Sequence, residues 1–199
     1  MTRLGYVLVT IVAAELFTVL FAAAAWFSSQ PRLLWNASAS ASIGLYRLHP
    51  GDTPIVGDMV AYRPSPALAR FMAGRHYLPV GVPLLKHVAA RPGATICRHD
   101  AAVTIDGRTV VVARAIDSHG RPLPVWRGCH VLQADQLFLL NTAPDSLDGR
   151  YFGPVPASGL IGRATPILTR DTPEAPLRWR SAAVRQFQPI THEGDVPCK

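Results

Sequence analysis

Hydrophobic residues are distributed very unevenly along the chain. The 22 residues from Tyr6 to Phe27 are apolar except for Thr10, Glu15 and Thr18. As a helix this run would measure roughly 33 Å at about 1.5 Å per residue, which matches a hydrocarbon core of about 30 Å. The pattern therefore predicts one transmembrane helix over residues 6–27 that anchors the chain.

The alternative to an anchor is a cleaved signal peptide, because Ala22 to Ala25 offers small residues for cleavage. The apolar core of a signal peptide is only about 7 to 15 residues long, which favours the anchor. Arg3 is the only charge ahead of the run and favours a cytoplasmic N-terminus, residues 1–5, although Arg32 weakly opposes it. Glu15 is either a neutral side chain without a role or a contact with a membrane-embedded partner.

Beyond the anchor, apolar residues form short runs of β-type sequence. Val103 to Ile105 and Val110 to Val112 are joined across Asp106-Gly107. This pair predicts a hairpin, because the turn needs positive φ angles that glycine adopts at little cost. Further strands are predicted around Lys86, at Val131 to Gln133, at Leu137 to Asn141 and at Leu160 to Leu168.

Only one short helix is predicted in this part of the chain. It begins at Pro66 after Ser65 and ends near Gly74. Alanines and serines alternate between Asn36 and Ser42, so an extended segment would present the serine hydroxyls on one face. With 18 prolines and 15 glycines, the chain is predicted to have a mainly β fold with long loops.

The net charge of +7 comes from scattered basic residues, which argues against nucleic-acid binding. A basic exterior that faces anionic membrane lipid is the simpler explanation. Residues 171–199 are predicted to form a C-terminal tail with Arg178, Trp179, Arg180 and Arg185. This tail either lies along a membrane surface or packs loosely on the domain in solvent.

Cysteine and histidine spacing gives no metal site, because the chain contains no CxxC or HxxxH motif. Cys97 and Cys129 flank a region of strand-like sequence, and a compartment outside the cytoplasm would let them pair. The alternative is two buried thiols, and the spacing does not decide between the two. Cys198 is left over.

Lysine usage gives the strongest chemical signal. The sequence has eighteen arginines and two lysines, Lys86 and the final Lys199. Lysine differs from arginine in that it can lose its proton, and burial beside Leu84, Leu85 and Val88 would lower its pKa from about 10.4. The alternative is a lysine on an exposed strand face. A histidine base is less favoured, because His87 would point to the opposite side of the strand from Lys86.

Three blocks carry a family resemblance. Asn36 to Tyr46 reads NASASASIGLY, and Leu84 to Gly93 reads LLKHVAARPG. The third block runs from Asn141 to Val155 and reads DSLDGRYFGPV from Asp145 onward. Together they resemble the signal peptidase family of Ser/Lys proteases, most closely its branch that serves conjugative transfer, the TraF-type peptidases. The first block resembles the branch signature N-x-S-x-S-x-P-x-G-L-Y. The other two resemble the family patterns K-R-V-x-x-x-P-G and N-S-x-D-S-R-x-x-G-x-V.

The resemblance implies a role for each matching residue. Ser40 would be the nucleophile and Lys86 the general base, while the Ser38 hydroxyl and the Ser40 amide would form the oxyanion hole. Ser146 would hydrogen-bond the lysine amine. Asp148 and Arg150 would form a buried structural pair.

Two positions depart from the family pattern. Ser42 stands where proline is expected, which removes a fixed φ angle and leaves Ser42 as the alternative nucleophile. Gly149 stands where the family has serine.

The resemblance also implies the architecture and the function. Residues 28–170 would form a periplasmic peptidase domain with a signal-peptidase-like antiparallel β-sheet core and a smaller inserted β lobe at about 98–130. The protein would be a single-pass protein of a bacterial inner membrane, without a cofactor, that cleaves or cyclises a membrane-borne precursor such as a conjugative pilin propeptide. The conjugation machinery would be a further partner. Two alternatives are a general type I signal peptidase and a non-catalytic periplasmic scaffold of a secretion complex.

Overall fold

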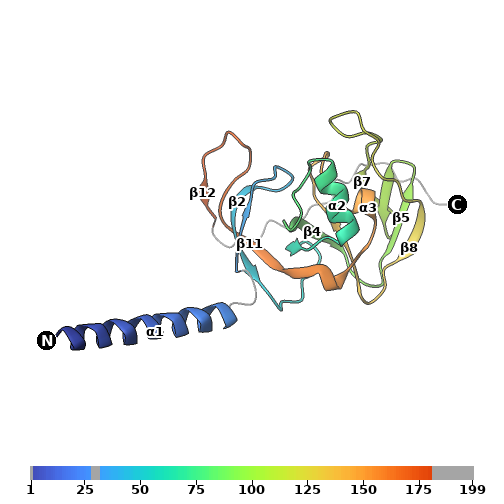
Figure 1. The fold of residues 1–199 in the computed structure, drawn as a ribbon. Coiled ribbons are helices and arrows are strands. Elements are labelled where there is room, and N and C mark those ends of the chain that lie inside the picture. Colours follow the sequence, from blue (N-terminus) through green and yellow to red (C-terminus); the bar gives the residue numbers. More distant parts are fainter. Residues whose placement is uncertain (1, 28–31, 181–199) are drawn as a thin grey trace. The chain divides into compact units, whose positions relative to one another are not determined.

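The N-terminal part of the chain is a single helix. The computed structural model describes residues 2–27 and 32–180, which fall into two compact units divided between residues 31 and 32. The first unit is α1 (Arg3–Phe27) (Figure 1). Within the described residues it is the one helix that is long and apolar enough to cross a bilayer, with a mean hydropathy of 2.4 over Arg3–Ala24. The predicted apolar N-terminal helix is confirmed.

The second unit is built on an antiparallel sheet of eight strands (Figure 1). These strands are β1 (Leu33–Asn36), β2 (Ile43–His49), β3 (Met59–Tyr62), β4 (Leu84–Ala90), β9 (Gln136–Leu140), β10 (Val155–Pro156), β11 (Leu160–Arg170) and β12 (Arg178–Trp179). Their order is β1-β2-β11-β3-β4-β9-β10, and β12 also pairs with β11. Strand β4 therefore lies inside the sheet, with β3 and β9 on its two sides.

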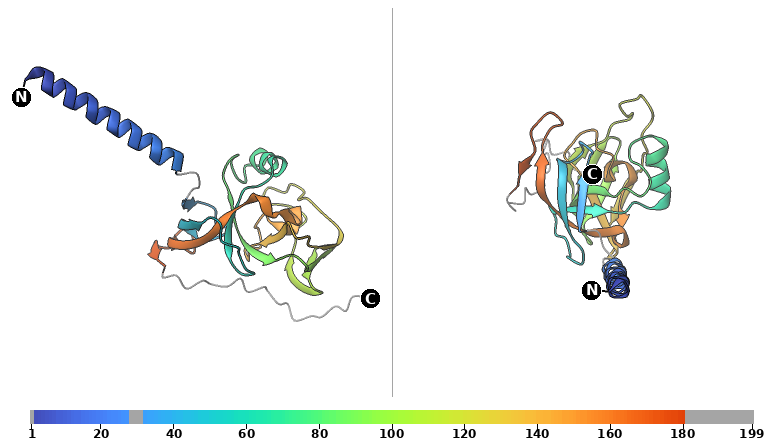
Figure 2. Two further views of the ribbon diagram at one scale, coloured as in Figure 1. Left: turned by 90° about the horizontal axis from the view of Figure 1, so that it is seen from below. Right: turned by 60° about the vertical axis from the view of Figure 1, so that its left-hand side comes forward.

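A smaller antiparallel sheet is inserted between β4 and β9 (Figure 2). Its strands are β5 (Thr95–His99), β6 (Ala102–Ile105), β7 (Arg108–Val112) and β8 (Gly128–Val131), in the order β7-β6-β5-β8. The turn between β6 and β7 has φ angles of 49° at Asp106 and 80° at Gly107. These values confirm the predicted hairpin, and the two sheets confirm the mainly β class with a smaller second sheet.

The apolar core fills the space between these elements. Ile96 and Val103 of the smaller sheet pack against Phe138 and Leu140 of β9, which joins the two sheets into one unit. Helix α2 (Pro66–Gly74) buries Met72 in a second cluster with residues of β3 and β4. The Ser65 hydroxyl accepts a hydrogen bond from the Leu68 amide at 3.3 Å, so this helix begins as predicted.

Three segments differ from the sequence prediction. Residues 37–42 form a turn and not an extended strand. The strand predicted at Val131 to Gln133 is instead the end of β8, which stops at Val131. The Gln133 side chain donates to the Val131 carbonyl and so folds back on its own backbone. The chain after Asp171, expected to be a tail, returns to the sheet as β12 up to Arg180, whose amide donates to the Ile167 carbonyl. Cys198 and Arg185 lie outside the described residues.

Candidate active site

Lys86 lies in the middle of β4 and is 3% exposed. It pairs in register with Val60 of β3, and the neighbouring strands and core residues shield its side chain from water. Burial lowers the pKa of the Lys86 amine from 10.5 to about 8, while the Asp148 carboxylate raises the pKa and the Arg150 guanidinium lowers it. About one tenth of such amines are neutral at pH 7.

The serine-rich segment turns because Asn36 binds it from within. The Asn36 amide group donates to the carbonyls of Ser38, Ala41 and Ser42 at 2.9, 3.2 and 3.0 Å, and its oxygen accepts from the Ser38 amide at 3.1 Å. The turn replaces the predicted extended conformation because one side chain here satisfies four backbone groups. It brings the Ser38 and Ser40 hydroxyl oxygens to 3.2 Å from each other.

The buried amine lies between two hydroxyls. Lys86 Nζ is 2.6 Å from Ser146 Oγ and 3.5 Å from Ser40 Oγ. The Ser40 amide donates to Ser38 Oγ at 3.4 Å. Ser42 makes a different contact, because its hydroxyl donates to the Asp171 carboxylate at 3.0 Å. Of the serines 38, 40 and 42, only Ser40 is hydrogen-bonded to Lys86.

The loop that carries Ser146 is held by a buried ion pair. Arg150 Nε lies 2.8 Å from Asp148 Oδ1, and both side chains are nearly inaccessible to solvent. The Arg150 guanidinium also donates to the carbonyls of Asn141, Ala143 and Pro144. Each carbonyl belongs to the loop that leads to Ser146, so the pair fixes the path of that loop.

Asn141 is a site residue that sequence reasoning missed. Its side chain is 1% exposed, and its Nδ2 donates to the Ser40 carbonyl at 2.8 Å and to the Leu85 carbonyl at 3.1 Å. Its oxygen faces His87 Nδ1 at 3.3 Å. One amide thus connects the serine turn with the strand that carries Lys86. Its place at the end of an apolar strand was the available signal, but sequence gives no distance between strands.

A groove of about 610 Å³ opens over Ser40, Ser146 and Lys86. The serine turn forms one side, and the loop that carries Ser146 forms another. Apolar residues dominate the groove, which suits an extended peptide with apolar or small side chains. The lining includes Leu34, Trp35, Met72, Leu78, Val82, Leu84, Leu85, Ile116, Leu123 and Leu147.

Cys97 and Cys129, whose pairing the sequence did not decide, are bonded to each other. Cys97 of β5 and Cys129 of β8 form a disulfide across directly paired positions. The bond fastens an edge strand of the smaller sheet and does not line the groove.

Sequence comparison identifies relatives over most of the chain. The family described as signal peptidase, peptidase S26, matches residues 3–169. A probable conjugal transfer protein TraF from Sinorhizobium fredii is 35% identical over 156 residues, which cover 73% of this chain and 80% of the relative. A conjugal transfer protein TraF from Agrobacterium fabrum is 38% identical over 147 residues, covering 68% and 82%.

Two further similarities are weaker. A plasmid transfer protein TraF from Escherichia coli is 36% identical over 90 residues, which cover 43% of this chain and 51% of the relative. A crystal structure of a signal peptidase I from Enterococcus faecalis aligns with 56% of this chain and 97% of its own, at 19% identity and a TM-score of 0.34.

Proposed function

The chain belongs to the signal peptidase family, peptidase S26, and from this premise we propose that it is a membrane-anchored serine endopeptidase. Ser40 is the nucleophile and Lys86 is the general base in this proposal. The observation that carries it is a buried amine with a pKa of about 8 that lies 3.5 Å from one hydroxyl. A base whose pKa lies near neutral pH can take the proton of an adjacent hydroxyl, and this makes the serine a nucleophile.

The first chemical step is acyl transfer to the serine. The neutral Lys86 amine takes the Ser40 proton as Ser40 Oγ bonds to the scissile carbonyl carbon. The protonated amine then gives this proton to the leaving nitrogen, and the carbon–nitrogen bond breaks. The 3.5 Å separation is long for proton transfer, and such contacts commonly shorten when substrate binds.

Charge that develops on the carbonyl oxygen needs hydrogen-bond donors. The Ser40 amide and the Ser38 hydroxyl are the proposed donors, since they lie 3.4 Å apart on the same turn. The amide donates to the hydroxyl oxygen when no substrate is bound, so Ser38 must rotate its hydroxyl toward the new oxyanion. Loss of one such donor typically costs about 10²- to 10³-fold in rate.

The acyl-enzyme has two fates. Water attacks it and releases a cut peptide, or an amine of the substrate attacks it and closes a ring. Ser146 keeps the Lys86 amine in place for this second step through its 2.6 Å hydrogen bond.

The substrate and the location are part of this proposal, and the anchor and the relatives support them. An apolar helix long enough to cross a bilayer supports an inner-membrane location, for which we propose a domain that faces the periplasm. Relatives named as conjugal transfer proteins support a precursor that serves conjugation, for which a pilin propeptide is our proposal.

The test uses the full-length protein in detergent and a tagged pilin precursor. We expect Ser40→Ala and Lys86→Arg to abolish processing, because the first lacks the hydroxyl and the second keeps its proton. Ser42→Ala is the matched control and should process the precursor. The mass of the product separates hydrolysis from ring closure, since the two differ by one water.

Three results would contradict the assignment. Full processing by Ser40→Ala would exclude that nucleophile, and full processing by Lys86→Arg would exclude the lysine base. No processing by the unmodified protein of either a pilin precursor or a signal-peptide-bearing precursor would favour a scaffold role.

A further inference from the structure

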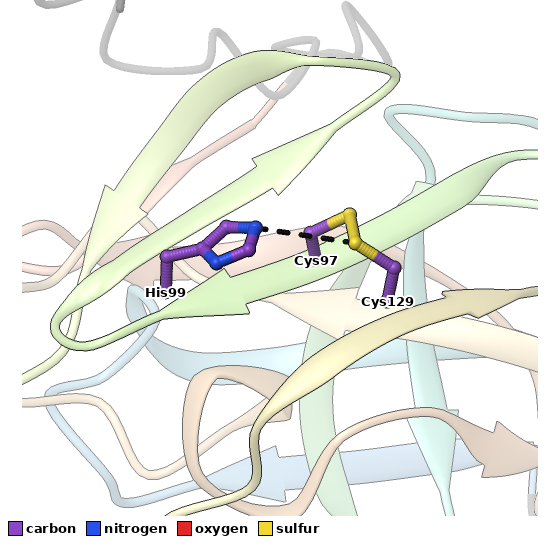
Figure 3. A group of neighbouring side chains, drawn as sticks. All are labelled: Cys97, His99 and Cys129. Carbon is purple, nitrogen blue, oxygen red and sulfur yellow. Dashed lines mark hydrogen bonds between the residues drawn. A yellow bond between two sulfur atoms is a disulfide. The ribbon is translucent and has the colours of Figure 1, made fainter. Parts of the chain in front are cut away.

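A second group of reactive side chains lies on the smaller sheet. Cys97 and His99 come from β5 and Cys129 comes from β8, and none of them lines the groove of the candidate active site. Figure 3 shows the imidazole ring beside the disulfide. His99 Nε2 lies 4.0 Å from Cys129 Sγ.

The strand geometry brings these three side chains together. Residues two apart on a strand share a face, so Cys97 and His99 point to the same side of β5. Cys129 is the direct cross-strand partner of Cys97. The two sulfur atoms and one ring nitrogen all lie within 4.8 Å of one another.

This donor set suits a soft cation. A tetrahedral zinc ion has bonds of about 2.3 Å to sulfur and about 2.0 Å to nitrogen, so its ligand atoms lie about 3.5 to 3.8 Å apart. The ring nitrogen is already near that distance from Cys129. After reduction the two sulfurs are no longer bonded, and small side-chain rotations can bring all three ligand atoms to these distances, since they already lie within 4.8 Å of one another.

We propose that Cys97, Cys129 and His99 bind one thiophilic d¹⁰ cation, Zn²⁺ or Cu⁺, when their disulfide is reduced. In the oxidised protein each sulfur is neutral and bonded to the other sulfur, so neither is the thiolate that a metal ion binds. The same three residues therefore form either a cross-strand link or a metal site.

The redox step requires an external dithiol. One dithiol transfers two electrons and two protons to the disulfide, which becomes two thiols, and the dithiol itself becomes a disulfide. Metal binding then releases the two thiol protons. Cys129 and His99 are exposed, so both the reductant and the metal have access, and solvent can fill a fourth coordination position.

The strand pairing around the site does not rest on the disulfide alone. Ile96 pairs with His130 and Arg98 pairs with Gly128 on either side of the cysteines. Backbone hydrogen bonds at these pairs keep β5 and β8 adjacent, so the ligands start close together and little entropy is lost when metal binds.

The experiment titrates the full-length protein with metal in detergent. Cys198→Ser is present in every variant, so that only two thiols are counted. The protein is reduced with a dithiol, freed of it under argon, and titrated with Co²⁺, whose thiolate charge-transfer absorbance reports binding. Zn²⁺ and Cu⁺ are then added in separate arms to displace Co²⁺, which shows which ion binds more tightly.

We expect one Co²⁺ per reduced chain and none per oxidised chain. His99→Ala should weaken binding at least tenfold. His130→Ala is the matched control, because His130 adjoins Cys129 but points to the other face of β8, and it should bind as the parent does.

Several results would overturn the proposal. These are the absence of a charge-transfer band at millimolar Co²⁺, unchanged affinity in His99→Ala, or an equal loss in His130→Ala. If reduction alone unfolds the smaller sheet, Zn²⁺ added before the dithiol should preserve the circular dichroism spectrum. Unfolding despite Zn²⁺ would also count against the site.

Discussion

At the scale of single residues, the chemistry depends on where one proton resides. Burial of Lys86 lowers its pKa to about 8, and Ser146 provides a 2.6 Å contact that orients the amine. Below that pKa, the neutral fraction of the amine rises about tenfold for each unit by which the pH increases.

The first prediction is the pH dependence of the proposed peptidase. We expect kcat/KM to rise with pH and reach half its plateau near pH 8, because only the neutral Lys86 amine can accept the Ser40 proton. Initial rates between pH 6 and 10 measure this. Ser42→Ala should show the same midpoint, whereas a midpoint near 6.5 would indicate a histidine base.

The second prediction concerns stability. Below pH 8 the folded chain must bury a charged amine, while between pH 8 and 10.5 the unfolded chain binds a proton that the folded chain does not. Stability therefore rises with pH through this window. Lys86→Met should raise the free energy of unfolding at pH 7 by about 1 to 3 kcal/mol, with a smaller gain at pH 10.5. Urea unfolding at both pH values tests this, and an equal gain at both would contradict it.

The third prediction concerns Asn141 as a positioning residue. Asn141→Ala removes both hydrogen bonds that connect the Ser40 and Leu85 carbonyls. We expect kcat to fall about 10²-fold with little change in KM, because a small misplacement of reacting groups has that effect. Thr142→Ala, at the exposed neighbouring residue, is the control. A KM effect without a kcat effect would argue against positioning.

At the scale of elements, the sequence patterns correctly predicted the elements that are stabilised by contacts between residues close in sequence. The Asp106-Gly107 hairpin and the helix after Ser65 depend on residues close in sequence, and both are present. The serine turn depends on the Asn36 side chain and on the Asn141 side chain from a strand far along the chain. A period-two pattern cannot reveal such contacts, so the extended segment was wrongly predicted.

The same contrast applies to the candidate site. The matching blocks named Ser40, Lys86 and Ser146, and the structure brings these three together within hydrogen-bonding distance. Asn141 begins the third block, but the pattern assigned it no role, because its Nδ2 donates to backbone carbonyls, which any residue type provides. The structure separates Ser40 from Ser42 by their partners, because Ser40 contacts Lys86 and Ser42 contacts Asp171.

The fourth prediction concerns Gly149, at the start of α3 (Gly149–Phe152). A Cβ there would lie 2.6 Å from the Phe138 ring and 2.8 Å from the Leu139 carbonyl oxygen. Gly149→Ser should therefore destabilise the domain by about 1 to 3 kcal/mol. Gly74→Ala, where a Cβ meets nothing within 4 Å, is the control in thermal unfolding. Equal melting temperatures for the two variants would contradict the steric argument.

At the scale of the domain, one arginine connects the smaller sheet to the candidate site. Arg98 is 3% exposed and lies between Cys97 and His99 on β5, so it points to the opposite face. It donates to the Asp100, Pro124 and Arg150 carbonyls. The smaller sheet is thereby bonded to the residue that holds the Ser146 loop.

The fifth prediction tests this connection. Arg98→Met should lower the free energy of unfolding by about 2 to 4 kcal/mol, because buried carbonyls lose a charged donor. It should also lower kcat, because Arg150 loses a contact. Arg108→Met, at an exposed position on β7, is the control. Unchanged stability in Arg98→Met would show that these hydrogen bonds of Arg98 do not hold the two sheets together.

The return of the chain along β11 has a practical consequence for gene truncation. Asp171 accepts the Ser42 hydroxyl and also pairs with Arg180 at 2.7 Å, so the serine turn is fastened to residues beyond the last long strand. A gene shortened at codon 170 would encode every proposed catalytic group, but it would omit Asp171 and Arg180 and thus both of these contacts. Expression of the domain without α1 should retain the codons through Arg180.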